Sequence, residues 1–419
     1  SGSIAGDQAG GRIDIASRDA ALDLPTVFPE SRIALASLDA NLEWTRSGED
    51  FSIELTRASF RNADAEGRAS GHYRRRRAGT PGEIDLDAKL TRGEGNAVWR
   101  YLPHAVNADT RNWLRDGVTE GRADDVTLKL KGDLAHFPFT DRSGVFRIQG
   151  RFRGATLKPA PGWPAIEDIT GDLLFDAARM RIGASQGQIL GATVGPVVAE
   201  IADLEAPEEL LTVEGKARGP TAAFLRFIEA SPVGERIDHF TEDMRGIGNG
   251  ELELKLSMPL RHVVDTRVTG GYRFDGNKLA VAPGVPALDD VRGRIEFSEK
   301  ALGAKDIRAR ALGGAMSLDI RTQNEGQVAV DARGEISIAQ LRQQMPSPLF
   351  DHLSGSSRWE GTVRVKKKNP EIRIASDLRG IASSLPEPFN KTAAESRALV
   401  VERKTPDPRL FPKATRAAL

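Results

Sequence analysis

Apolar and polar residues alternate along most of the chain. In one stretch Ile84, Leu86, Ala88 and Leu90 take every second position, and charged residues stand between them. The same alternation recurs in segments 126–130, 252–258, 316–320, 363–365 and 372–374. In a β-strand this pattern puts apolar side chains on one face and charged side chains on the other. Glycines and Asp/Asn clusters punctuate the runs, which is typical of hairpins. The pattern therefore predicts antiparallel strands, and no regular βαβ alternation indicates a parallel sheet.

An internal repeat adds long-range order to this pattern. Residues 161–169 read Pro-Gly-Trp-Pro-Ala-Ile-Glu-Asp-Ile, and residues 283–291 read Pro-Gly-Val-Pro-Ala-Leu-Asp-Asp-Val. The two copies begin 122 residues apart, at 161 and 283, and an alternating strand follows each of them. A weaker third copy of that strand occupies residues 38–44.

Each copy is expected to end in two short helices. The first would run from a polar N-cap to a proline, at 96–103, 221–232 and 337–346, with Asn96, Thr221 and Ser337 as the caps. These caps lie 125 and 116 residues apart. The second would follow around 113–114, at 240–244 and at 349–353. The repeat unit is thus about 120 residues long.

The fold class that these observations predict is mostly β: an elongated, strongly curled antiparallel β-sheet, a groove-like repeat array with short helices between repeats. No Gly/Ser-rich or Pro-rich linker separates the copies, so the strands are expected to continue from one copy to the next. The predicted divisions are a partial first β-repeat at 1–106, a second at 107–232, a third at 233–346, the start of a fourth at 347–403, and an irregular tail at 404–419.

Composition narrows the function. The 59 basic and 59 acidic residues cancel, which argues against the positive field of a nucleic-acid binder. Aromatic residues make up 6% of the chain, so platforms for base stacking are not expected. The chain has no cysteine, which excludes disulfides, thiolate catalysis and Cys-ligated metals. The sequence contains no run of about 18 apolar residues, so it predicts no transmembrane helix.

Motifs for catalysis are weak. Residues 183–187 match the G-x-S-x-G pattern of a nucleophile elbow, but glycines follow instead of an apolar helix, so we interpret the segment as a hairpin. The glycine-rich stretch 246–250 precedes a strand and is interpreted as a turn. The six histidines are scattered, and Asp238-His239 near Glu242 is interpreted as a solvated surface. The basic runs 74–77 and 366–368 are expected at solvent-facing strand ends or hairpin tips, and contact with anionic lipid headgroups is the alternative. No catalytic residue, metal ligand or cofactor is predicted.

A resemblance carries the functional hypothesis further. The stretch Phe137-Pro138-Phe139, Gly144-Val145-Phe146-Arg147-Ile148 and Pro161-Gly162-Trp163-Pro164, together with residues 378–388, resembles the YhdP family of AsmA-like proteins of the Gram-negative envelope. The resemblance covers residues 99–401 well and the first hundred more loosely. It implies a periplasmic protein, anchored to the inner membrane by a helix outside this segment, that conducts phospholipids towards the outer membrane. It implies phospholipid as the ligand, and leaves room for inner- and outer-membrane proteins as partners at the ends of the full-length chain.

Under this hypothesis the apolar strand positions would line the lipid groove. A chain of about fifteen methylenes costs roughly 12 kcal/mol to expose to water, so an apolar trough would remove a large barrier. The candidate lining residues are Leu128, Leu130, Phe146, Ile148, Phe152, Leu173, Phe175, Leu254, Leu256, Ile295, Phe297, Leu318 and Ile320. The alternative is a structural or adhesive β-repeat protein with a closed, dry core and no ligand, in which these residues are ordinary core. An all-β hydrolase is a more distant third reading.

Overall fold

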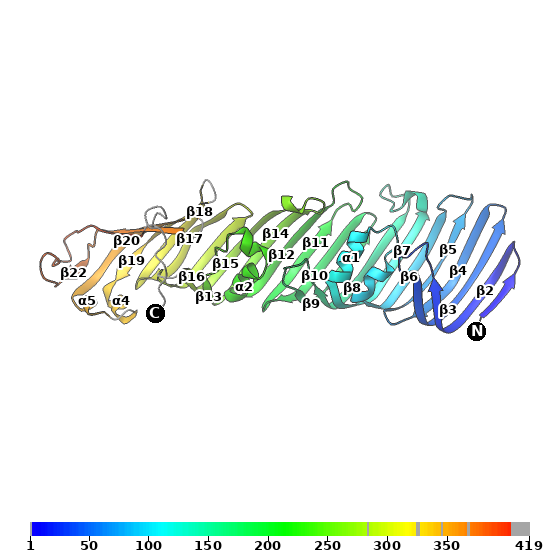
Figure 1. Ribbon diagram of the computed structural model, residues 1–419, viewed down its shortest axis with the longest axis horizontal. Helices are drawn as coiled ribbons and strands as arrows, with labels where there is room; N and C mark the ends of the chain where they lie inside the picture. The colour runs from blue at the N-terminus through cyan, green and yellow to red at the C-terminus, as the bar shows by residue number, and fades with distance from the viewer. Residues whose placement is uncertain (1, 283–284, 324–326, 345–346, 367–368, 404–419) are drawn as a thin grey trace, which may run out of the picture. The chain divides into compact units, whose positions relative to one another are not determined.

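The computed structural model describes residues 2–282, 285–323, 327–344, 347–366 and 369–403 (Figure 1). In these ranges 23 strands belong to one antiparallel sheet, with a few short helices. The mostly β, antiparallel fold class is therefore confirmed. The predicted tail at 404–419, the repeat residues Pro283 and Gly284, the helix end at Pro346 and Lys367-Lys368 of the second basic run lie outside the described residues.

The chain forms two compact units. Unit 1 comprises Ser1–Ile189, Thr193–Ala217 and Lys255–Thr266, and unit 2 comprises Leu190–Ala192, Arg218–Leu254 and Arg267–Leu419. Each unit is described by itself, and the repeat divisions drawn from the sequence stay a prediction.

Unit 1 is built from strands that pair with their neighbours in the chain. From β1 to β10 each strand is antiparallel to the next. Most of β11 and β12 and the end of β14 also belong to this unit. The strands are β1 (Gly2–Gly6), β2 (Gly10–Asp23), β3 (Arg32–Ser47), β4 (Asp50–Arg61), β5 (Ala65–Arg75), β6 (Glu83–Glu94), β7 (Val118–Asp133), β8 (Val145–Leu157), β9 (Ile166–Asp176), β10 (Arg179–Ile189), β11 (Ala192–Ile201) and β12 (Leu210–Pro220). The helices are η1 (Gly95–Tyr101), α1 (Ala108–Gly117), η2 (Leu134–His136) and η3 (Val263–Asp265).

Unit 2 repeats this architecture. From β15 to β21 each strand is again antiparallel to the next. The strands are β13 (Arg245–Ile247), β14 (Asn249–Pro259), β15 (Arg267–Ala280), β16 (Leu288–Ser298), β17 (Leu302–Ala311), β18 (Gly314–Thr322), β19 (Val328–Ser337), β20 (Leu353–Lys366), β21 (Asn369–Ser376), β22 (Ile381–Ser383) and β23 (Leu399–Arg403). The helices are α2 (Thr221–Glu229), α3 (Pro232–Arg236), α4 (Ile338–Gln344) and α5 (Pro348–Asp351).

One face of each unit carries charged side chains in cross-strand pairs. In unit 1, Lys129 Nζ lies 2.7 Å from Asp85 and 2.6 Å from Asp87. In unit 2, Arg294 lies 2.7 Å from Glu253. Because side chains alternate along a strand, the residues on either side of each of these charges point to the opposite, apolar face.

Bulges interrupt many of the strand pairs. Non-glycine residues with positive φ stand at Asp125, Asp168, Asp290 and Asp306, with φ of 54°, 51°, 49° and 52°, and register shifts accompany them. Asp and Asn tolerate this conformation better than most residues. An extra residue in one strand bends it and increases its twist, so these positions favour a curved sheet.

The repeat seen in the sequence has a structural counterpart. Asp168 and Asp290 occupy the same place in the two copies and share the same positive φ. The apolar residues that follow them, Ile169 and Val291, are both buried, at 9% and 1% exposure. The two copies thus have the same backbone bend and bury the apolar side chain at the equivalent position.

The short helices are present, but several of their expected boundaries are wrong. The segment at 96–103 is a 3-10 helix that begins at Gly95, so Asn96 is not its cap. Thr221 is the first residue of α2, whose N-cap is Pro220. The residues at 240–244 form turns, and the helix that follows α2 is α3. Pro232 presets the first turn of α3, and this helix therefore begins earlier than predicted.

The side-chain caps occur on the second helix of each pair. Asn107 accepts a hydrogen bond from Thr110 N at 2.8 Å at the start of α1. Ser231 accepts one from Val233 N at the start of α3, and Ser347 accepts one from Leu349 N at the start of α5, both at 3.4 Å. A short polar side chain in extended conformation before the first turn satisfies an amide that the helix leaves free.

Candidate functional site

The apolar face of unit 1 is organised in rows that cross the strands. Direct cross-strand partners share a face, so a chain of such partners traces one row across the sheet. The alanine row crosses β2 to β10 and consists of Ile15, Ala40, Ala58, Ala69, Ala88, Leu128, Ile148, Phe175 and Met180. The leucine row lies beside it and consists of Ile13, Leu42, Leu55, Gly71, Leu86, Leu130 and Phe146.

Unit 2 carries a comparable row across β15 to β21. Its members are Tyr272, Ile295, Ala304, Ile320, Val330, Val363 and Ile372. A second row beside it consists of Ile307, Leu318, Ala332, Gly361 and Ile374. Each unit therefore presents apolar side chains in lines that run from strand to strand.

The structure brings most of the thirteen candidate lining residues together in these rows. Leu128, Ile148 and Phe175 are successive members of the alanine row, and Leu130 faces Phe146 in the leucine row. Leu173 lies on the same face of β9 as Phe175, and Phe152 lies on the same face of β8 as Ile148.

The remaining candidates lie on β14 or in unit 2. Ile295 and Ile320 face Ala304 from either side, and Leu318 is on the same face of β18. Phe297 faces Gly270 and Leu302 at the end of β16. Leu254 and Leu256 are two positions apart on β14, which places them on one face of that strand.

Exposure distinguishes these side chains from an ordinary dry core. Twelve of the thirteen candidates are only partly buried, and Leu318, at 8% exposure, is the buried one. Every member of the two rows of unit 1 from β4 to β10 is also only partly buried. A contiguous apolar surface that solvent reaches is typical of a place where another apolar molecule binds.

The candidate lining residues drawn from the sequence left out the alanines of this apolar face, although the alternation at residues 84–90 included Ala88. Ala40, Ala58, Ala69 and Ala88 continue the alanine row through β3 to β6, yet an alanine alternating with polar residues gives a weak hydrophobic signal. Leu42, Leu55 and Leu86 were detectable by the same alternation that identified Leu128 and Leu130. What the sequence alone lacks is the register that joins these positions into one row.

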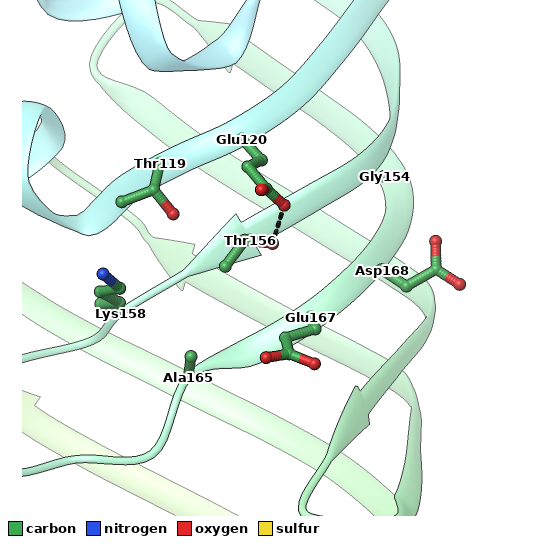
Figure 2. A pocket seen from close by; sticks show the side chains of 8 residues that line it. All are labelled: Thr119, Glu120, Gly154, Thr156, Lys158, Ala165, Glu167 and Asp168. Carbon is green, nitrogen blue, oxygen red and sulfur yellow. Dashed lines mark hydrogen bonds between the residues drawn. The ribbon is translucent and has the colours of Figure 1, made fainter.

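A second feature of unit 1 is a polar hollow of about 460 Å³ where β7, β8 and β9 meet (Figure 2). Its lining residues are Thr119, Glu120, Gly154, Thr156, Lys158, Ala165, Glu167 and Asp168. Thr156 Oγ1 donates a hydrogen bond to Glu120 Oε2 at 2.8 Å, and Figure 2 shows Asp168 pointing away from the other side chains. The hollow is polar and open, so it is unsuited to hold an acyl chain.

The electrostatics of unit 1 stabilise the charged face. Hydrogen bonds from Lys129 and Lys131 lower the pKa of Asp85 to about 2. Arg261 binds Glu209 through two hydrogen bonds of 2.8 and 2.9 Å, and this contact, with the residue's own backbone amide, lowers the pKa of Glu209 to about 2. Both carboxylates are therefore charged at neutral pH and are matched by cations on neighbouring segments.

The motifs considered for catalysis have structural roles. Residues 183–187 lie inside β10, and Ser185 Oγ donates to Thr170 O at 3.0 Å, so this segment lacks the strand–turn–helix geometry of a nucleophile elbow. His239 Nδ1 lies 3.2 Å from Glu229 Oε2. In the described ranges, no group of three or more His, Asp or Glu side chains is arranged to hold a metal ion.

Two further predictions concern the ends of hairpins and membrane helices. Arg74 and Arg75 are the last two residues of the hairpin strand β5, and Arg74 pairs with Asp50 at 2.6 Å, as expected for a basic run near a hairpin tip. Among the helices of the described residues, none has the length and apolar character needed to cross a bilayer.

Comparison with known proteins agrees with the resemblance. The model of the family described as YhdP protein matches residues 1–415. The chain is 23% identical over 414 residues to the "Intermembrane phospholipid transporter YhdP" of Escherichia coli (strain K12). The alignment covers 96% of this chain and 32% of that protein, so the chain spans about a third of the length of this relative. No solved structure matches it. Because the family model covers nearly the whole chain, the chain belongs to the YhdP family.

Proposed function

We propose that this chain binds phospholipids on the apolar face of its sheet and passes their acyl chains along the rows, as a segment of a periplasmic bridge between the inner and outer membranes. The observation that carries the proposal is the incomplete burial of the rows in unit 1 from β4 to β10. The name of the Escherichia coli relative, an intermembrane phospholipid transporter, supports the same substrate class. An anchor in the inner membrane would lie outside this segment.

The direction of the rows suits this function. Each row crosses the strands, and consecutive strands lie about 4.8 Å apart. The eight strand-to-strand steps from β2 to β10 in the alanine row would therefore cover roughly 38 Å. An extended acyl chain laid along such a row would exchange water for apolar contact at about 0.8 kcal/mol per methylene. Because neighbouring positions are chemically alike, the chain can shift by one strand without losing that contact.

The competing function is a structural β-repeat protein with a dry core. It would require the apolar face to be covered by protein, as it is around Val291 and Ile307 of unit 2, which are 1% and 2% exposed. The rows of unit 1 are not covered to that degree. The partly exposed rows therefore favour a ligand-binding face over a dry core in unit 1.

The test is to purify the chain under gentle conditions and identify bound lipid by mass spectrometry. A photo-reactive residue placed at Leu130, in the leucine row, should crosslink phospholipid. The same residue placed at Arg151, which is on the charged face of β8, is the control and should not crosslink. Absence of phospholipid from the purified chain, together with absence of crosslinks from Leu130, would contradict the proposal.

A further inference from the structure

The connection between β7 and β8 folds back onto the apolar face of unit 1. We call this connection, residues 134–144, the lip. Its first residue is tied to the neighbouring hairpin, because Leu134 N donates to Gly82 O at 2.9 Å. Two tight turns follow, in which Phe139 N donates to His136 O at 2.7 Å and Arg142 N donates to Phe139 O at 3.0 Å. The lip is therefore a compact, hydrogen-bonded structure.

Phe139 anchors the lip between two glycines. Its side chain is 2% exposed. A Cβ atom at Gly132 would lie 2.8 Å from Phe139 Cε1, and one at Gly144 would lie 2.7 Å from Phe139 Cδ1. Any larger residue at these two positions would displace the ring, so the end of β7 and the start of β8 are shaped to receive it. Gly132 alternates with Leu128 and Leu130, so the ring covers the apolar face.

In contrast to the buried Phe139, Phe137 is exposed. It is 45% exposed, although its ring contacts Phe146, the last member of the leucine row, with centroids 4.9 Å apart. It also meets Phe139 edge-on at 6.0 Å. An aromatic ring held firmly at the border of an apolar surface, with nearly half of its area free, has room to contact a further apolar group.

The second turn of the lip ends at a basic residue, Arg142. Asp141 accepts hydrogen bonds from Ser143 N at 2.9 Å and Ser143 Oγ at 2.6 Å, and lies 3.3 Å from His136 Nδ1. Its neighbour Arg142 is exposed and takes part in no ion pair among the described residues. Most of the basic side chains on the nearby strands have acidic partners, for example Lys131 with Asp85 at 2.8 Å and Arg147 with Asp176 at 2.9 Å.

We propose that the lip is a headgroup site, in which Phe137 packs on the glycerol end of a phospholipid lying on the leucine row and Arg142 pairs with its phosphate. This inference rests on the proposed function and names the part of the lipid that unit 1 recognises. The lip carries an exposed aromatic ring in contact with the leucine row and, five residues later, an exposed guanidinium, and this sequence of groups corresponds to the order of acyl chain, glycerol and phosphate along a phospholipid. A lipid that lacks a phosphate would contact the leucine row and Phe137 but would form no ion pair with Arg142.

The experiment measures binding of two lipids from detergent to the purified chain: phosphatidylglycerol, and diacylglycerol with the same acyl chains. Phe137→Ala should weaken both about fivefold, because part of an aromatic contact is lost. Arg142→Gln should weaken phosphatidylglycerol about threefold to fivefold, the upper part of the range of an exposed ion pair, and leave diacylglycerol unchanged. The control variants are Val145→Ala, an exposed apolar residue on the opposite face, and Arg151→Gln, and both should bind as the unaltered chain does.

The outcomes distinguish failure of the proposed headgroup site from failure of the proposed lipid-binding function. An unaltered chain that binds neither lipid contradicts the lipid-binding function itself. A chain that binds both lipids, with Phe137→Ala and Arg142→Gln equal to the controls, overturns the lip alone. Equal loss of both lipids in Arg142→Gln overturns the phosphate contact. A photo-reactive residue at position 137 gives a second readout, because it should crosslink to the glycerol end of the lipid and not to the acyl terminus.

Discussion

The apolar faces of the two units follow the same strand pattern but differ in how they are filled. In unit 1 the rows from β4 to β10 are only partly buried, and four alanines form part of the floor. In unit 2 the corresponding face contains a packed cluster in which Val291, Ile307 and Trp359 are 1%, 2% and 7% exposed. The alternation and the pairing are alike in the two units, so neither of them accounts for this difference.

Trp359 has the largest side chain among the buried members of the unit 2 cluster. A Cβ atom at Gly334 would lie 3.1 Å from Trp359 Cε2, and one at Gly361 would lie 3.1 Å from Trp359 Cζ3. The indole therefore lies over two glycines on neighbouring strands and covers the floor there. The comparison teaches that one alternating pattern carries both rows that stay partly exposed, as from β4 to β10, and a buried cluster in which a large ring lies across two glycines.

The largest effect is expected for a charge placed in the packed cluster. Ile307→Asp should destabilise the chain by about 4 kcal/mol or more, because a buried carboxylate has no partner there. Urea unfolding followed by circular dichroism measures this change. A loss below about 1 kcal/mol would mean that solvent reaches the unit 2 cluster, and that the two faces do not differ in packing.

Removing the indole should convert the closed face towards the open one. Trp359→Ala is expected to cost about 3 kcal/mol, the usual loss for deleting a large buried side chain. If the vacated floor accepts acyl chains, the variant should bind more lipid per chain than the unaltered protein, as measured by mass spectrometry. A variant that loses stability without any gain in lipid would show that the neighbouring side chains collapse into the space.

A charge on the open face should act on binding more than on folding. Leu130→Asp should cost only about 1 kcal/mol, because the side chain is partly exposed and the carboxylate can reach water. It should nevertheless abolish crosslinking of lipid to a probe at Leu128, since an acyl chain would have to pass a desolvated charge. Unfolding comparable to that of Ile307→Asp would indicate a dry core in unit 1 as well.

The smallest effect is expected in unit 1, where lowering the pH should reduce the free energy of unfolding. Asp85 and Glu209 have folded-state pKa values of about 2, below the value of about 4 expected for the unfolded chain. The stabilisation is therefore complete above about pH 4 and is lost as the pH falls through 2. Because both contacts are near solvent, each is worth only about 0.5 to 1 kcal/mol. Urea midpoints at pH 7 and pH 2.5 measure the difference, and Asp85→Asn should remove part of it. An Asp85→Asn chain with the same pH dependence would contradict this account.

Much of the fold could be predicted from the sequence. Alternation is a direct consequence of strand geometry, so it located the apolar faces, and the repeat at 161 and 283 identified two bends that the structure shows to be alike. The short helices were also located, although Asn96 and Thr221 are not caps and the residues at 240–244 form turns. Helix boundaries depend on a few local hydrogen bonds, which the apolar pattern does not encode.

The candidate site was harder to predict. The alternating pattern treats Leu130 and Leu318 as equivalent, yet the first is partly exposed and the second is buried at 8%. That distinction depends on what packs against each residue, and Leu318 belongs to a buried cluster that includes Trp359, 41 positions further along the chain. The lip was noticed in the sequence as Phe137-Pro138-Phe139, but the different burial of its two rings follows from the glycines at 132 and 144.

The pairing of each strand with its neighbour in the chain also bears on how the protein folds. From β1 to β10, each strand needs only the strand before it, so a growing sheet can add hairpins in the order in which they are synthesised. These pairs do not require contacts between segments that are far apart in the sequence, and forming such contacts slows the folding of many β-proteins. The corresponding liability is that every intermediate ends in a strand with unpaired amides, which another chain could extend. In this architecture, therefore, adding strands one after another makes folding rapid, but it also requires that the last strand be protected from pairing with other chains until the next strand is added.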